Sequence, residues 1–66
     1  MINARCQFSA EAEKRGIKTL RYWSGEPRKY VGKITGESED GTRWLVVWDG
    51  MRHPRQIEKV LIESEG

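Results

Sequence analysis

The sequence predicts one small all-β domain: a five-stranded barrel with a long first loop and one short helical turn. Three observations favour this fold. The chain has 66 residues, which suffice for one domain and are too few for a two-sheet sandwich. Its β-branched and aromatic residues gather in short runs, and turn signals rich in glycine separate these runs. A barrel removes exposed sheet edges by curling, which suits so short a chain.

The second half of the chain contains the two strongest strand candidates, residues 30–35 and 42–48. Both are rich in β-branched and aromatic side chains. Each is followed by an Asp-Gly pair, at 40–41 and at 49–50, and such pairs suit the positive φ angles of tight turns. We therefore expect a hairpin on either side of the strand that ends at Trp48.

The last part of the chain is predicted to close the domain with shorter elements. Pro54 restricts residues 52–56 to a short edge strand or an irregular segment. Residues 56–59 are predicted to form one helical turn, and residues 60–62 a final strand. The predicted organisation is a single domain, 1–63, followed by a frayed tail, 64–66.

The first half of the chain is less regular. Residues 4–8 are predicted to be a strand, and Ser9 is a suitable N-cap for a short helical turn over 10–15. Gly16 can end that turn in a left-handed conformation. Residues 19–29 contain a glycine and a proline and show no clean hydrophobic period, which predicts a long loop.

The composition argues against several classes of function. Cys6 is the single cysteine and His53 the single histidine, too few for an intramolecular disulfide or a structural zinc site from one chain. Cys6 and His53 alone also lack the third group that nucleophilic catalysis needs, and no glycine-rich loop has phosphate-binding spacing. We expect a cytoplasmic protein that is not an enzyme and has no cofactor, metal or membrane partner.

A pattern of glycines, turns and a late proline runs through the second half of the chain. Its residues are Gly32, Ile34, Gly36, Ser38, Asp40-Gly41, Trp48-Asp49-Gly50, Pro54 and Leu61-Ile62-Glu63. This pattern resembles a group of uncharacterised small bacterial and bacteriophage proteins with an SH3-like barrel. It resembles more remotely Tudor and KOW modules, which bind peptides or nucleic acids. The resemblance covers about half the chain and implies the fold but no activity. The chain departs from the pattern at Leu45 and Val47, where polar residues are expected.

Alternate positions of the strand 42–48 are expected to face opposite sides of the sheet. Trp44 and Val46 are predicted to lie in the core. Trp48 shares their face but ends the strand, so it belongs either to the core or to an aromatic recognition surface. Leu45 and Val47 point the other way, where either the long first loop covers them or they form the contact of a weak homodimer.

Charge is distributed unevenly along the chain. Residues 1–33 carry a net charge of +5, and residues 34–66 a net charge of −3. The excess is concentrated in residues 14–33, where seven basic residues stand against one glutamate. Three aromatic residues are interleaved with these cations: Tyr22, Trp23 and Tyr30.

Interleaved cations and aromatic rings predict nucleic-acid binding, because cations hold phosphates and exposed rings stack on unpaired bases. Two other functions stay open: a module that binds a peptide or an acidic protein against Trp48 or a sheet edge, and a homo-oligomeric structural unit. Ordinary solvated charge explains many basic segments as well. The candidate binding residues are Arg21, Tyr22, Trp23, Arg28, Lys29, Lys33, Trp48, Arg52 and Arg55.

Overall fold

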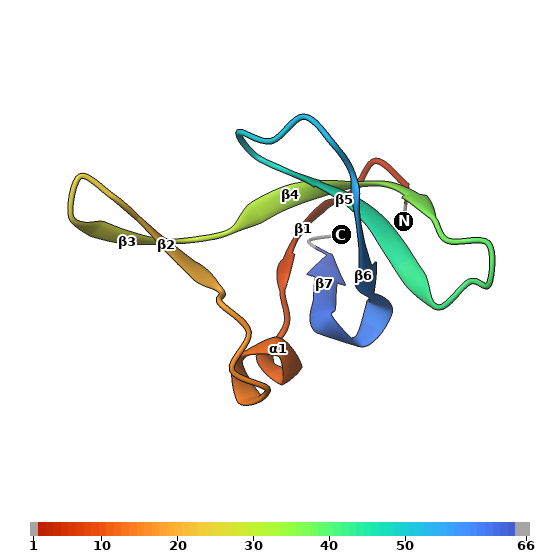
Figure 1. Ribbon diagram of the computed structural model, residues 1–66, viewed down its shortest axis with the longest axis horizontal. Coiled ribbons are helices and arrows are strands. Elements are labelled where there is room, and N and C mark those ends of the chain that lie inside the picture. The colour runs from red at the N-terminus through yellow and green to blue at the C-terminus, as the bar shows by residue number, and fades with distance from the viewer. Residues whose placement is uncertain (1, 65–66) are drawn as a thin grey trace.

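The computed structural model describes residues 2–64, and this part of the chain is mostly β-structure (Figure 1). It contains one short α-helix, and a 3-10 turn, η1, precedes the last strand. The elements in chain order are β1 (Arg5–Phe8), α1 (Ala10–Lys14), β2 (Leu20–Trp23), β3 (Glu26–Lys29), β4 (Val31–Glu37), β5 (Arg43–Trp48), β6 (Arg55–Glu58), η1 (Lys59–Leu61) and β7 (Ile62–Ser64). The predicted all-β class is therefore confirmed.

Five of the strands form one antiparallel sheet in the order β6-β5-β4-β1-β7. The three consecutive strands β4, β5 and β6 are neighbours, and the first and last strands of the chain lie side by side. No pairing joins β6 to β7 among the described residues, so the sheet is open. Strands β2 and β3 form a separate two-stranded sheet.

The prediction of a long loop over residues 19–29 is wrong. This segment is a β-hairpin in which Trp23 lies opposite Glu26, and Ser24 and Gly25 form the turn. The φ angles of Ser24 and Gly25 are 53° and 82°, the two left-handed residues that a type I′ hairpin turn requires. Pro27 is tolerated because both strands of a two-stranded sheet have an edge without a ladder partner. We call residues 20–29 the ribbon.

The predicted boundaries near the C-terminus are also wrong. A helical turn was predicted over 56–59, but residues 55–58 form strand β6. This strand pairs with residues 43–46 of β5. The helical turn comes later, as η1, and β7 reaches Ser64, which lies opposite Cys6. The first residue of the predicted frayed tail is thus part of the sheet, whereas residues 65–66 lie outside the described residues.

The core lies on one face of the five-stranded sheet. Cys6, Ile34 and Val46 are fully buried, and Trp48 and Ile62 are each less than a tenth exposed to solvent. The ring of Trp48 packs against Phe8, with 4.6 Å between the ring centroids, and against the edge of Tyr30 at 6.1 Å. Trp44 is half-buried against the same cluster. Of the two interpretations of Trp48, the structure favours the core.

The close packing of Trp48 requires a glycine on the neighbouring strand. Gly32 lies opposite Trp48 in the register of β4 and β5. A Cβ atom at Gly32 would lie 2.8 Å from Cε3 of Trp48 and 2.8 Å from the carbonyl oxygen of Val47. Both distances are far below van der Waals contact, and the backbone oxygen cannot rotate away. Gly32 therefore leaves the space that the indole of Trp48 occupies beside β4.

Leu45 and Val47 are half-buried on the other face of β5. The predicted cover for these side chains was the segment 19–29. That segment forms the ribbon, which projects away from the five-stranded sheet instead of lying along it (Figure 1). The ribbon therefore does not supply their cover, and self-association through Leu45 and Val47 stays a prediction.

Asp40 organises the turn between β4 and β5 and makes this turn sensitive to acid. Its Oδ1 accepts hydrogen bonds from the Ser38 hydroxyl at 2.7 Å, the Thr42 hydroxyl at 2.8 Å and the Thr42 backbone N–H at 3.0 Å. These bonds, that of Ser38 above all, lower the pKa of Asp40 from 3.8 to about 2. Its ionised form therefore stabilises the folded chain above pH 4, and this contribution is lost as the pH falls towards 2.

We expect the Asp40→Asn variant to lose less stability than the wild type between pH 4 and pH 2, because it lacks the carboxylate that becomes protonated. Urea unfolding at several pH values measures the difference. The matched control is Glu39→Gln, which removes the adjacent exposed carboxylate and leaves the hydrogen bonds to Asp40 in place. Parallel pH profiles for wild type and Asp40→Asn would contradict the role given to Asp40.

Candidate nucleic-acid interface

The ribbon carries two different surfaces. Strand residues alternate between faces, and the register places Leu20 opposite Lys29, Arg21 opposite Arg28, Tyr22 opposite Pro27 and Trp23 opposite Glu26. The tyrosine face therefore consists of Leu20, Tyr22, Pro27 and Lys29. The tryptophan face consists of Arg21, Trp23, Glu26 and Arg28. Tyr22 and Trp23 are almost equally exposed, at 70% and 69%, but they point to opposite sides.

The tryptophan face places two guanidinium groups on directly opposite residues, Arg21 and Arg28. Like charges in this arrangement destabilise a strand pair. The nearest described counter-charge to Arg28 is Glu26, with 3.8 Å between Nη2 and Oε2, and the side chains of both residues are largely exposed. Such a long, solvated pair contributes little. The charge of Arg28 is therefore available to an anion from outside.

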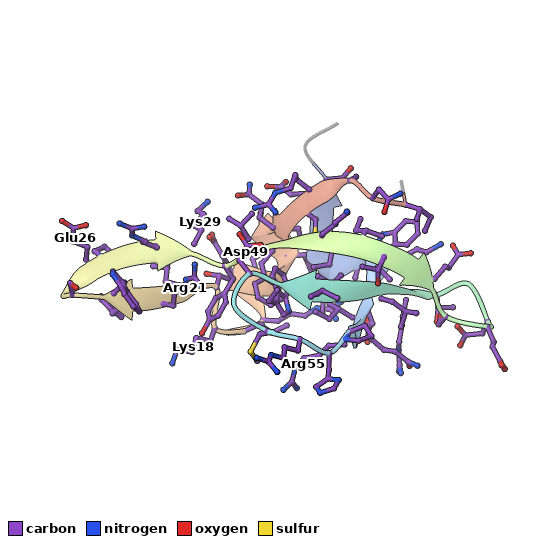
Figure 2. All side chains as sticks on the ribbon, turned by 90° about the horizontal axis from the view of Figure 1, so that it is seen from above. Lys18, Arg21, Glu26, Lys29, Asp49 and Arg55 are labelled. Atoms are coloured by element: carbon purple, nitrogen blue, oxygen red, sulfur yellow. The ribbon has the colours of Figure 1, made fainter. Side chains whose placement is uncertain are left out.

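Arg21 is more firmly positioned than Arg28. Its Nη1 donates a hydrogen bond to the backbone oxygen of Asp49 at 3.3 Å, and its guanidinium lies 6.0 Å from the centroid of the Tyr30 ring. Figure 2 shows Arg21 beside Asp49, where the ribbon joins the five-stranded sheet. This contact fixes the side chain at the base of the ribbon and leaves its other N–H groups to bind a ligand.

A groove of about 290 Å³ lies between the tryptophan face and the turn that follows β5. Its lining residues are Arg21, Trp23, Arg28, Asp49 and Gly50. The Asp49 carboxylate forms a bidentate ion pair with Arg5, in which Nη2 donates to Oδ2 at 2.8 Å and Nη1 donates to Oδ1 at 3.2 Å. The hydrogen bonds from Arg5 lower the pKa of Asp49, and the charges of Arg5 and Arg21 act in the same direction. The groove thus combines two cations, one indole ring and one ionised carboxylate.

The remaining candidate residues do not all lie near this groove. Lys29 lies on the tyrosine face, and Lys33 is exposed on β4 opposite Val47. Arg52 is exposed in the connection after β5, and Arg55 begins β6. Figure 2 shows Lys29 and Arg55 on opposite sides of the molecule. Trp48 is 6% exposed, so its ring faces are not available for stacking.

The structure therefore brings together Arg21, Trp23 and Arg28 from the predicted set. It also adds Asp49 and Gly50, which sequence reasoning interpreted only as turn residues. The Asp-Gly pair was a correct signal for the turn, but nothing in it indicates that the turn faces the ribbon.

A second groove, of about 450 Å³, shares no lining residue with the first. Its lining residues are Phe8, Ile17, Arg43, Gln56, Ile57, Glu58 and Leu61. Its apolar lining comes from Phe8, Ile17, Ile57 and Leu61, and its charges are those of Arg43 and Glu58. Glu58 is already paired with Arg15 at 3.5 Å. Three of its lining residues belong to β6, an edge strand of the five-stranded sheet, and the groove lacks the cation pair and exposed indole of the first.

Residues 2–64 contain no group of three His, Cys, Asp or Glu side chains that could hold a metal ion. The helical segments in this range are too short and too polar to cross a membrane. Comparison of the chain with protein-family models, with curated proteins and with solved structures finds no match. The fold and the groove define a small, mostly β protein whose distinguishing feature is a projecting basic and aromatic ribbon.

Proposed function

We propose that this chain is a non-catalytic module that binds nucleic acid through the ribbon. The observation that carries the proposal is Trp23, 69% exposed beside two arginines that face each other across the strand pair. Exposed indole rings are costly in water and common where a protein contacts a ligand. Guanidinium groups pair with phosphate oxygens in a bidentate fashion, and an indole offers a flat surface for a base.

The surroundings of the ribbon support the same proposal. Lys18 and Lys29 lie at its base, on opposite sides in Figure 2, and Lys33 follows on β4. These lysines surround the base of the ribbon with positive charge. Such cations supply affinity without sequence specificity, because they neutralise phosphates and release counterions.

We also propose that the five-stranded sheet is an SH3-like barrel that is not fully closed. Three features support this proposal: the consecutive strands β4-β5-β6, the 3-10 turn before the last strand, and the pairing of β7 with β1. The ribbon occupies the position of the long first connection of such a barrel. In this fold, the binding function would lie in the insertion and the barrel would serve as its base.

The test is the salt dependence of binding to fluorescein-labelled oligonucleotides, single-stranded and duplex, followed by fluorescence anisotropy. Each phosphate contact contributes a slope of about −0.7 to −0.9 to the plot of log affinity against log salt. Three or more contacts should therefore give a slope of about −2 or steeper. The absence of binding to either form at low salt would overturn the proposal.

The second candidate function is a protein-interaction module, and the apolar groove beside β6 favours it. An extended peptide could add a strand to the free edge of β6 and place side chains on Phe8, Ile57 and Leu61. This function becomes the leading one if oligonucleotides fail to bind. A weak homodimer through Leu45 and Val47 is compatible with both functions, and sedimentation of the wild-type protein measures it directly.

A further inference from the structure

We propose that the nucleic acid is single-stranded and that one nucleotide is held in the groove between the tryptophan face and the Asp49-Gly50 turn. Its base would stack on Trp23, and its phosphate would lie between Arg21 and Arg28. This inference rests on the proposed nucleic-acid function and specifies its ligand class.

The order of groups along the tryptophan face matches the parts of a nucleotide. Trp23 and Glu26 form the level nearest the tip, and Arg21 and Arg28 form the next level towards the sheet. Side chains two residues apart on one face of a strand are about 6.8 Å apart, which is the scale of a single nucleotide. Asp49 and Gly50 close the groove at its base.

The arginine level suits a phosphate better than a base. One N–H group of Arg21 donates to the Asp49 carbonyl, which fixes the guanidinium. The remaining N–H groups can donate to a phosphate. Arg28 is held by Glu26 at 3.8 Å and can exchange this weak pair for a phosphate. Glu26 is the one carboxylate of the ribbon and lies opposite Trp23. There it would face a base, whose N–H groups can donate to it, and not the phosphate.

A single strand fits this groove better than a duplex. Stacking on a side chain needs an unpaired base, because the bases of a duplex already cover each other's faces. The volume of about 290 Å³ lies just below the usual range for small-molecule sites, which limits the ligand in the groove to about one nucleotide. The competing arrangement inserts the ribbon into the major groove of a duplex, which is wide enough for two strands. That arrangement would contact both faces of the ribbon.

The two aromatic residues of the ribbon separate these arrangements. Trp23 and Tyr22 have nearly the same exposure and adjacent positions, but Trp23 lines the groove and Tyr22 lies on the opposite face. Tyr22→Ala is therefore a matched control for Trp23→Ala. Both side chains are largely solvated, so neither variant should affect folding, and far-UV circular dichroism checks this point.

The experiment measures the dissociation constants of a labelled oligothymidylate of about 12 nucleotides and of a duplex of the same length at low salt. We expect the wild type to bind the single strand about tenfold more tightly than the duplex or better. We expect Trp23→Ala to weaken single-strand binding about tenfold or more, and Tyr22→Ala to change it by less than about threefold. Trp23→Phe, which keeps a flat ring, should recover most of the loss.

The outcomes separate this inference from the function on which it rests. Equal losses for Trp23→Ala and Tyr22→Ala, or a preference for the duplex, overturn the single-strand inference and leave nucleic-acid binding in place. Absence of binding to both oligonucleotides overturns the nucleic-acid function itself.

Discussion

Replacement of Trp48 by alanine is expected to leave a large part of the protein unfolded at 25 °C. The side chain is 6% exposed and packs on Phe8 and Tyr30. Loss of a buried tryptophan costs about 3–5 kcal/mol. A single core in a chain of 66 residues supplies about 3–5 kcal/mol of folding free energy, so this one substitution removes most or all of it.

The three tryptophans provide a graded series for this measurement. Trp48 is buried, Trp44 is half-buried beneath the Lys59 ammonium group at 4.2 Å from its ring, and Trp23 is exposed. The loss in free energy of unfolding on substitution by alanine should therefore be largest for Trp48, smaller for Trp44 and smallest for Trp23. Urea unfolding followed by far-UV circular dichroism measures all three without depending on indole fluorescence. A Trp48→Ala variant as stable as Trp23→Ala would contradict the core position of Trp48.

Reversal of two ribbon charges should nearly abolish nucleic-acid binding. In the variant Arg28→Glu with Lys29→Glu, each exposed cation becomes an anion, one on each face of the ribbon. A hydrogen bond to a charged group contributes about 1.5–3 kcal/mol. Loss of the Arg28 contact, with added repulsion from both reversed charges, should weaken binding about 100-fold or more. Anisotropy titration with the oligonucleotides described above measures the change.

The matched control reverses two exposed cations away from the ribbon, Lys14 on α1 and Arg43 on β5. The variant Lys14→Glu with Arg43→Glu has the same net charge as the ribbon variant. It should weaken binding far less, because the general field changes equally while the local contacts are kept. Equal losses in the two double variants would show that net charge, and not the ribbon, determines binding.

Strands β1, β4 and β5 of the main sheet could be predicted from the sequence because burial leaves a pattern. Val46 and Trp48 alternate with less buried residues on β5, and the Asp-Gly pairs mark where this strand's hairpins turn. The ribbon leaves no such pattern. With both faces in water, Tyr22 and Trp23 occupy adjacent positions without alternation of apolar and polar residues. Pro27 also argued against a strand, and the two-residue Ser24-Gly25 turn was the one local signal.

The candidate site could be predicted in composition but not in arrangement. The cations and aromatic residues of the segment are visible in the sequence as a charge cluster. Which of them share a face depends on the strand register, and a loop has none. The register separates Tyr22 from Trp23 and joins Trp23 to Arg21 and Arg28. Asp49 comes close to this face through a long-range contact with Arg21, and no local sequence pattern indicates that contact.

The ribbon's attachment to the rest of the protein has a consequence for the dynamics of the chain. Outside its own strand pairing, the described hydrogen bonds that anchor it run from the Tyr30 N–H to the Thr19 carbonyl and from Arg21 to the Asp49 carbonyl. An isolated two-stranded hairpin is marginally stable in water, so the ribbon should open at a much lower free energy than the sheet. A ligand that bridges both strands and the Asp49-Gly50 turn can bind only when the ribbon is in its paired, folded form. Part of the binding energy is then spent on ordering the ribbon, and its backbone amides should exchange with solvent quickly in the free protein and slowly in the complex.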